Sequence, residues 1–140
     1  MINIARILLT IAAIQYGLIP PIVDFTESHV FHEAWPPHAR FHMVWLLTVG
    51  SGLAAYIIYL VWSPARNKRR QLKIASILGA IILGGFFITT STRGLFGGEL
   101  ADPAHQISIL GMDGNLLSFG IAAVLQITAM AIIWVEPERR

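Results

Sequence analysis

The chain has 140 residues, of which 55% are hydrophobic and only 13% are charged, and its formal net charge is +2. A soluble domain usually carries about 25% charged residues, so this composition is typical of a membrane protein. The chain contains no cysteine, which excludes disulfides, iron–sulfur clusters and covalently attached haem.

Four stretches of the chain contain no Asp, Glu, Lys, Arg or His: residues 7–23, 43–65, 74–92 and 114–135. Each approaches the roughly 20 residues that a helix needs to cross a bilayer, and together they leave little chain for a soluble domain. We therefore predict an all-α fold, a four-helix transmembrane bundle formed by one domain over residues 1–140. The expected helices span about 4–23, 38–62, 72–92 and 114–135. We expect the first to be an uncleaved helix, because it ends in two prolines rather than in a signal-peptidase site.

The segment after the first helix, residues 24–42, concentrates titratable side chains. It reads DFTESHVFHEAWPPHARFH and contains four of the five histidines. Asp24 could simply start a turn, because Asp24-Phe-Thr-Glu27 has the form of a capping box. Alternatively, Asp24 and His29 could bind a metal ion. The other titratable residues of the loop would then support the site as hydrogen-bond or ion-pair partners: Glu27, His32 and Glu33.

A second helix is expected to begin at Pro36-Pro37, because proline suits the first turn of a helix. His38 and His42 then lie four residues apart on one helix face, where two imidazoles can share one Zn, Cu or Fe ion. The simpler alternative is a pair of interfacial histidines bonded to loop carbonyls. Arg40 points to another face. We expect it to pair with an acidic residue of the loop, or to hold an anion or a lipid headgroup.

Lysine and arginine are strongly biased to one side of the predicted membrane. Eight of the ten basic residues lie near the chain ends or in the loop after the second helix: Arg6, Arg66, Lys68, Arg69, Arg70, Lys73, Arg139 and Arg140. The positive-inside rule places both termini and this loop in the cytoplasm. We expect the membrane to be a bacterial inner membrane. The pI near 9.4 therefore indicates topology and contact with the lipid bilayer, and we expect no nucleic-acid partner.

In this topology all five histidines and six of the eight carboxylates lie on the outer face. The loop over residues 93–113 adds His105, which could complete or cover a metal site. Asp102 more simply caps a short helix that begins at Pro103. Gln126 lies in the middle of the last helix, where an amide is expected to hydrogen-bond a neighbouring helix.

Two local segments resemble known families. W-P-P-H-A-R-F-H, residues 35–42, resembles a family of small uncharacterised four-helix membrane proteins, a likeness that implies the fold but no activity. D-F-T-E-S-H, residues 24–29, is similar to a D-F-T-x-S-H segment in the C subunit of copper membrane monooxygenases. In those subunits an aspartate and two histidines ligate a metal at the outer membrane boundary. That likeness implies Asp24, His29 and the later His42 as ligands.

The leading hypothesis is a divalent-metal site (Cu, Zn or Fe) on the outer face, built from Asp24, His29, His38 and His42 with His105 nearby. Such a site would act on a membrane-soluble substrate or deliver the metal. One alternative is a non-catalytic accessory subunit that docks onto other membrane subunits or onto a second copy. Another is a metal-free lipid-binding or isomerase-type bundle that transfers protons through His and Glu. The sequence leaves open whether the protein is an enzyme.

Overall fold

The computed structural model describes residues 1–101 and 106–135. Its elements, in chain order, are α1 (Ile2–Asp24), α2 (Pro37–Trp62), α3 (Lys68–Thr92), the 3-10 helix η1 (Arg93–Leu95), β1 (Ser108–Ile109), β2 (Met112–Asp113) and α4 (Gly114–Val135). The four α-helices are each long and apolar enough to cross a membrane. The chain is therefore mostly helical and built from four long helices, as predicted.

Two details differ from the sequence-based expectation. α3 begins at Lys68, earlier than residue 72, because the side chain of Asn67 accepts a hydrogen bond of 2.9 Å from the backbone N–H of Arg70 and so caps the helix. The loop before α4 contains a minimal antiparallel hairpin, in which β1 and β2 pair around Leu110-Gly111. Both turn residues have positive φ, 54° and 77°, as a two-residue hairpin turn requires. Leucine rarely adopts this conformation, so the sequence did not indicate the turn.

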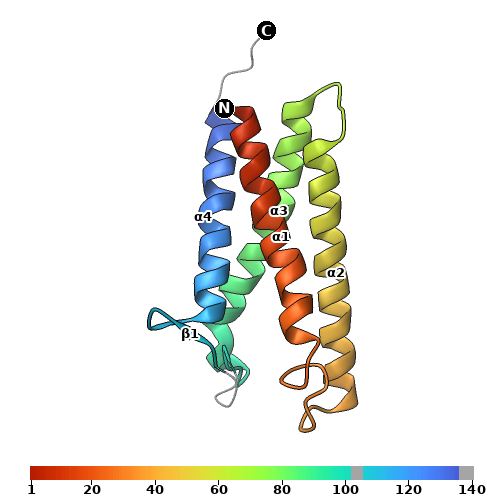
Figure 1. Ribbon diagram of the computed structural model, residues 1–140, viewed down its shortest axis with the longest axis vertical. Helices are drawn as coiled ribbons and strands as arrows, with labels where there is room; N and C mark the ends of the chain where they lie inside the picture. The colour runs from red at the N-terminus through yellow and green to blue at the C-terminus, as the bar shows by residue number, and fades with distance from the viewer. Residues whose placement is uncertain (102–105, 136–140) are drawn as a thin grey trace.

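α1 contacts each of the other three long helices, most extensively α2 and α4 (Figure 1). Small residues let it approach its neighbours closely: Ala5, Ala12 and Ala13 are fully buried. A Cβ atom added at Gly17 would overlap Cβ of Ala54, so α1 and α2 cross at this glycine. Close approach of this kind is what small residues provide between apolar helices.

Two residues in the middle of α1, Gln15 and Gly17, bind two different helices through polar groups. Gln15 donates its amide hydrogen to the backbone carbonyl of Ser118 in α4, at 2.6 Å. The carbonyl of Gly17 accepts a hydrogen bond of 2.8 Å from Ser51 in α2. Because few other groups in an apolar core can satisfy a polar atom, these bonds fix how the helices sit against one another.

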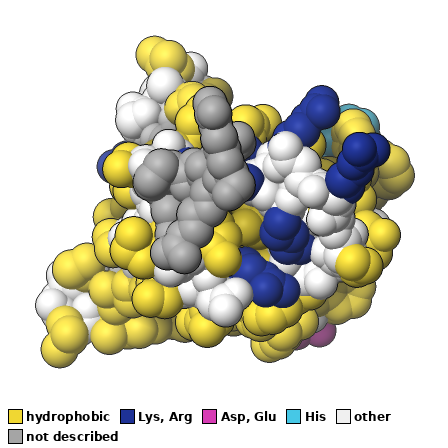
Figure 2. All heavy atoms as spheres, turned by 90° about the horizontal axis from the view of Figure 1, so that it is seen from above, with side chains coloured by type: hydrophobic (Ala, Val, Ile, Leu, Met, Phe, Trp, Pro, Cys, Tyr) yellow, Lys and Arg dark blue, Asp and Glu magenta, His cyan; other side chains and the backbone are white. Residues whose placement is uncertain are grey.

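Lys and Arg side chains gather at the end of the bundle where α1 and α3 begin and α2 and α4 finish (Figure 2). We call it the basic end; its described cations are Arg6, Arg66, Lys68, Arg69, Arg70 and Lys73. Several of them donate to the last carbonyls of a neighbouring helix. Arg6 bonds Val61 at 3.2 Å and lies 4.3 Å from the ring centre of Trp62. A cation at a helix C-terminus is favoured by the helix dipole.

The opposite end of the bundle carries the connection from α1 to α2 and the loop from η1 to α4 (Figure 1). We call it the histidine end, because His29, His32, His38 and His42 all lie there. The two ends therefore separate six of the eight described Lys and Arg residues from the described histidines and carboxylates, as the loop charges predict.

Candidate functional site

The histidine end is organised by a compact loop, residues 25–36, that folds back on the end of α1. The backbone N–H of Val30 donates to the carbonyl of Asp24 at 3.0 Å, and the Val30 side chain is 4% exposed. Further backbone bonds join His29 and Phe31 to the carbonyl of Thr26. The loop is thus a series of tight turns around one buried side chain, which holds its polar residues in defined positions.

His38 and His42 form a close pair at the start of α2. Their Nε2 atoms lie 3.0 Å apart, and their rings stand at 86° with centroids 4.5 Å apart. Pro36 and Pro37 set this register, since the helix begins at Pro37 and the two histidines then fall one turn apart on the same face. Both side chains are exposed.

The spacing of the two nitrogens is close to that of two ligands on one metal ion. Metal–nitrogen bonds of about 2.0–2.1 Å at a tetrahedral angle separate the two nitrogens by roughly 3.3 Å. Without a metal, one imidazole N–H donates to the other nitrogen. The pair can therefore act as a two-nitrogen chelate with little rearrangement.

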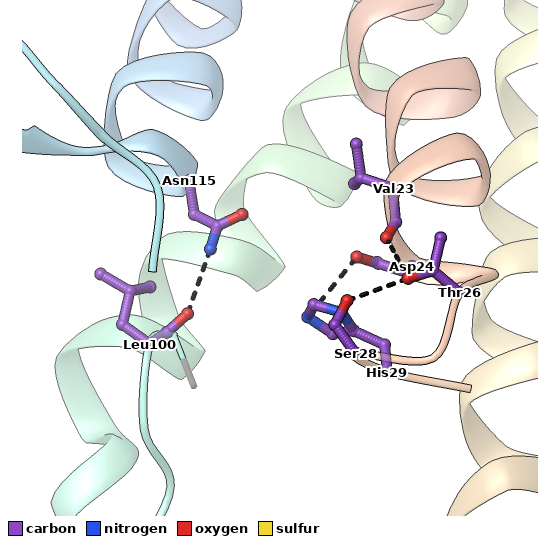
Figure 3. Close-up of polar contacts among 7 residues, drawn as sticks. All are labelled: Val23, Asp24, Thr26, Ser28, His29, Leu100 and Asn115. Carbon is purple, nitrogen blue, oxygen red and sulfur yellow. Dashed lines mark hydrogen bonds and ion pairs between the residues drawn. The ribbon is translucent and has the colours of Figure 1, made fainter. Parts of the chain in front are cut away.

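Asp24 and His29 form a second pair at the end of α1 (Figure 3). His29 Nε2 lies 3.8 Å from Asp24 Oδ1, and the other ring nitrogen, Nδ1, lies 2.9 Å from the hydroxyl oxygen of Ser28. The Ser28 hydroxyl lies 2.9 Å from that of Thr26, and Thr26 donates to the carbonyl of Val23, also at 2.9 Å. A continuous chain of hydrogen bonds therefore runs from the backbone of α1 to the imidazole.

The direction of this chain follows from counting hydrogens. A carbonyl oxygen can only accept, so the single hydroxyl hydrogen of Thr26 points to Val23. Ser28 must then donate to Thr26, and the Ser28 oxygen accepts from Nδ1–H of His29. A neutral His29 in this tautomer turns an unprotonated Nε2 toward Asp24. The pair thus presents two lone pairs to a cation, which can be a proton or a metal ion.

Arg40 bonds a carbonyl rather than the acidic partner that the sequence suggested. Its Nη2 donates to the carbonyl of His32 at 2.8 Å, and its buried Nε has no partner within residues 1–101 and 106–135. Glu27 and Glu33 are both exposed. An exposed carboxylate keeps its hydration, and an ion pair there gains little. Arg40 therefore ties the loop to the first turn of α2.

The candidate ligands are placed in two pairs rather than in one cluster. In the described part of the chain, no group of three or more His, Asp or Glu side chains is arranged to hold a single metal ion. His38 with His42 is one pair, and Asp24 with His29 is the other. His105 and Asp102 lie outside the described residues.

The sequence analysis did not single out Thr26 and Ser28, although these hydroxyls orient His29. Their only signal was the segment D-F-T-E-S-H itself, which contains both.

An open groove lies beside the site, between the end of α1 and α2. Six residues line it: Pro21, Phe25, Val44, Leu47, Thr48 and Ser51.

In the loop before α4, Asp113 caps the helix by accepting from the backbone N–H of Asn115 at 2.8 Å. The amide of Asn115 in turn donates to the carbonyl of Leu100 at 3.1 Å (Figure 3). These hydrogen bonds between side chains and backbone hold this loop to the start of α4. None of the candidate metal ligands lies among the described residues of the loop.

Comparison with known proteins gives one match. No curated protein matches the chain, and no solved structure does. A protein-family model matches residues 8–112, a stretch that contains every candidate ligand named above. The chain therefore belongs to the family described as "Family of unknown function (DUF6640)".

Proposed function

We propose that the protein is an integral membrane protein that binds a divalent transition metal at the histidine end, on the periplasmic side of a bacterial inner membrane. Four long apolar helices support the membrane location. The gathering of Lys and Arg at the basic end supports the orientation, because cytoplasmic segments are enriched in these residues.

The observation that carries the metal proposal is the 3.0 Å separation of the Nε2 atoms of His38 and His42. Two imidazoles on one helix turn need no loop closure to meet, so the chelate is largely formed before the ion arrives. Two imidazole nitrogens one helix turn apart suit any of the divalent first-row ions that bind nitrogen, including Zn²⁺ and Cu²⁺. Cu²⁺ is also bound most tightly of the divalent first-row ions at nitrogen sites. We therefore propose copper as the preferred metal.

Two protein ligands on an exposed helix face favour exchange of the metal over permanent retention. Catalytic zinc sites usually hold the ion with three protein ligands. Both histidines are exposed, so the other coordination positions of a bound ion would be open to water or to ligands from another molecule. The arrangement therefore supports capture and transfer of copper at the membrane surface. The likeness of D-F-T-E-S-H to a copper-enzyme segment makes Asp24 and His29 the alternative copper site, and the test below distinguishes it from the histidine pair.

The test is a Cu²⁺ titration of the purified protein in detergent, with bound metal measured by elemental analysis. Equimolar copper is expected in the unmodified chain and in Asp24→Asn, and it should be lost in the double variant His38→Ala, His42→Ala. Binding should also weaken as the pH is lowered, because ligand imidazoles must be neutral to bind a metal ion. Copper retained in the double variant but lost in Asp24→Asn would move the site to the second pair. No copper in the unmodified chain would contradict the proposal.

A second candidate is the accessory-subunit role, which the surroundings of the histidine pair favour. Phe41 and Trp45 are 64% and 57% exposed and lie beside His42, with each ring centroid 5.8 Å from its imidazole. An exposed aromatic strip next to two mutually bonded histidines also suits a contact with another membrane subunit. Co-purification of a stoichiometric partner in mild detergent, lost in Trp45→Ala and independent of copper, would favour this role.

A further inference from the structure

Two buried polar atoms from different helices meet over one glycine in the core of the bundle. Tyr16 of α1 is 4% exposed and Gln126 of α4 is 2% exposed. A Cβ atom added at Gly79 of α3 would lie 2.7 Å from Gln126 Oε1 and 2.8 Å from the Tyr16 hydroxyl oxygen. Both oxygens therefore face the same side of Gly79, where any other residue would place a side chain.

Each of the two oxygen atoms can still form a hydrogen bond. The Gln126 amide N–H donates to the carbonyl of Ser76 at 2.6 Å, which holds the side chain and leaves Oε1 as a free acceptor. Neither Gln126 Oε1 nor the Tyr16 hydroxyl has a hydrogen-bond partner within residues 1–101 and 106–135. A buried polar atom without a partner costs about 1–3 kcal/mol, and nearly all such atoms in folded proteins bind protein or ordered water.

We propose that Tyr16 and Gln126 bind one water molecule beside Gly79. The Tyr16 hydroxyl donates to the water oxygen, and the water donates one hydrogen to Gln126 Oε1. The ligand must accept one bond and donate another, which is the chemistry of a hydroxyl group. Because Tyr16 and Gln126 are both buried, the proposed occupant is a single water rather than a larger alcohol. Two polar partners are the minimum that such a water requires.

This water would complete the set of polar links made by the middle of α1. Gln15 already joins α1 to α4, and Gly17 joins α1 to α2. The water joins Tyr16 to α4 and rests on the backbone of α3. Gly79 is then required for a specific reason: the Cβ atom of an alanine would lie 2.7 and 2.8 Å from the two oxygens, too close for them to keep their positions. The inference is independent of metal binding at the histidine end.

The direct test is water-to-protein polarisation transfer by solid-state NMR on the labelled protein in bilayers. We expect early transfer from water to the side-chain carbons of Tyr16 and Gln126, although both are buried. Leu9 and Ile57 are 0% exposed and apolar, so they provide the internal reference that should receive transfer late. Equally late transfer at all four side chains would overturn the proposal, including the case in which Tyr16 bonds Gln126 directly.

A stability measurement gives a second and independent readout. Tyr16→Phe removes only the hydroxyl group, and loss of a bridged hydrogen bond should lower the midpoint of thermal unfolding by about 3–8 °C. Tyr59→Phe is the matched control, because Tyr59 is 62% exposed and should tolerate the change. If Tyr16→Phe left the midpoint unchanged or raised it, the hydroxyl would be an unpaired group whose removal relieves a cost, and the proposal would be wrong.

Discussion

The basic end and the histidine end use their charged and titratable side chains in different ways. At the basic end, cations bind the backbone carbonyls that finish a neighbouring helix. Lys68 donates to Leu60 and Ser63 at 3.0 and 2.6 Å, and Arg69 donates to Ile133 at 2.9 Å. At the histidine end, four titratable side chains face one another instead, in the two pairs His38–His42 and Asp24–His29.

This difference separates groups that stabilise the fold from groups that are available for ligands. A lysine or arginine that caps a helix has its donors committed to the backbone, so removing it should cost stability. A pair of side chains that turn nitrogen or oxygen atoms toward each other, rather than toward the backbone, can exchange that contact for a metal ion or a proton. Its removal should affect binding more than folding. The predictions below test this separation.

The largest expected effect is the position of the two ends relative to the membrane. A topology reporter fused after Arg140 should give a cytoplasmic signal, and one inserted at Gly98 should give a periplasmic signal, because Lys and Arg are retained on the cytoplasmic side. Paired alkaline-phosphatase and fluorescent-protein fusions distinguish the two outcomes. Identical signals from the two positions, or the reverse pattern, would remove the basis for calling the histidine end periplasmic.

The next effect concerns the spacing of the two histidines in α2. Exchanging neighbours, His42→Met with Met43→His, keeps the composition but moves the second imidazole about 100° around the helix, off the face of His38. We expect equimolar Cu²⁺ binding to be abolished while the unfolding midpoint stays nearly the same, since His42 is exposed. Elemental analysis and thermal unfolding in detergent measure the two outcomes. Unchanged copper binding would show that helical register is not what builds the site.

A smaller effect is predicted at the basic end, on stability alone. Arg69 bonds the carbonyls of Ile133 and Trp134, so Arg69→Ala should lower the free energy of unfolding by about 1–2 kcal/mol. Arg70 is exposed and has no side-chain hydrogen bond within the described residues, so Arg70→Ala should change stability by less than about 0.5 kcal/mol. Neither change should alter copper binding. Equal effects of the two substitutions would argue against helix capping by Arg69.

Hydropathy and local spacing predicted much of this arrangement. The four helices follow from the apolar runs. The hydrogen bond from Gln126 to the neighbouring helix follows because a buried amide needs a partner. The meeting of His38 and His42 depends only on two positions one turn apart in a helix that starts at proline. Features that depend on how the chain turns were not predictable in this way. The path of residues 25–36 decides that Asp24 and His29 form a pair of their own, apart from His38 and His42.

Other features depend on the packing of separate helices or on unusual backbone conformations. The hydrogen-bond chain through Thr26 and Ser28 requires the loop to turn back onto the carbonyl of Val23. The turn at Leu110 requires a conformation that leucine seldom adopts. The meeting of Tyr16 and Gln126 over Gly79 joins three helices that are far apart in sequence. No local pattern encodes contacts of that kind.

The smallest expected effect is at Arg40, a cation of the histidine end that binds as the cations of the basic end do. Its guanidinium donates to the carbonyl of His32, eight residues earlier. Arg40→Ala should therefore lower the free energy of unfolding by about 0.5–1.5 kcal/mol, and Arg40→Lys should lower it less, because an ammonium can still donate to one carbonyl. Urea unfolding followed by circular dichroism in detergent would measure both. If His38 and His42 bind copper, the copper affinity should not change in either variant, since Arg40 holds the loop rather than the chelate. A fall in copper affinity with unchanged stability would instead make Arg40 part of the binding site, and the separation between structural cations and ligand-binding side chains would fail at this residue.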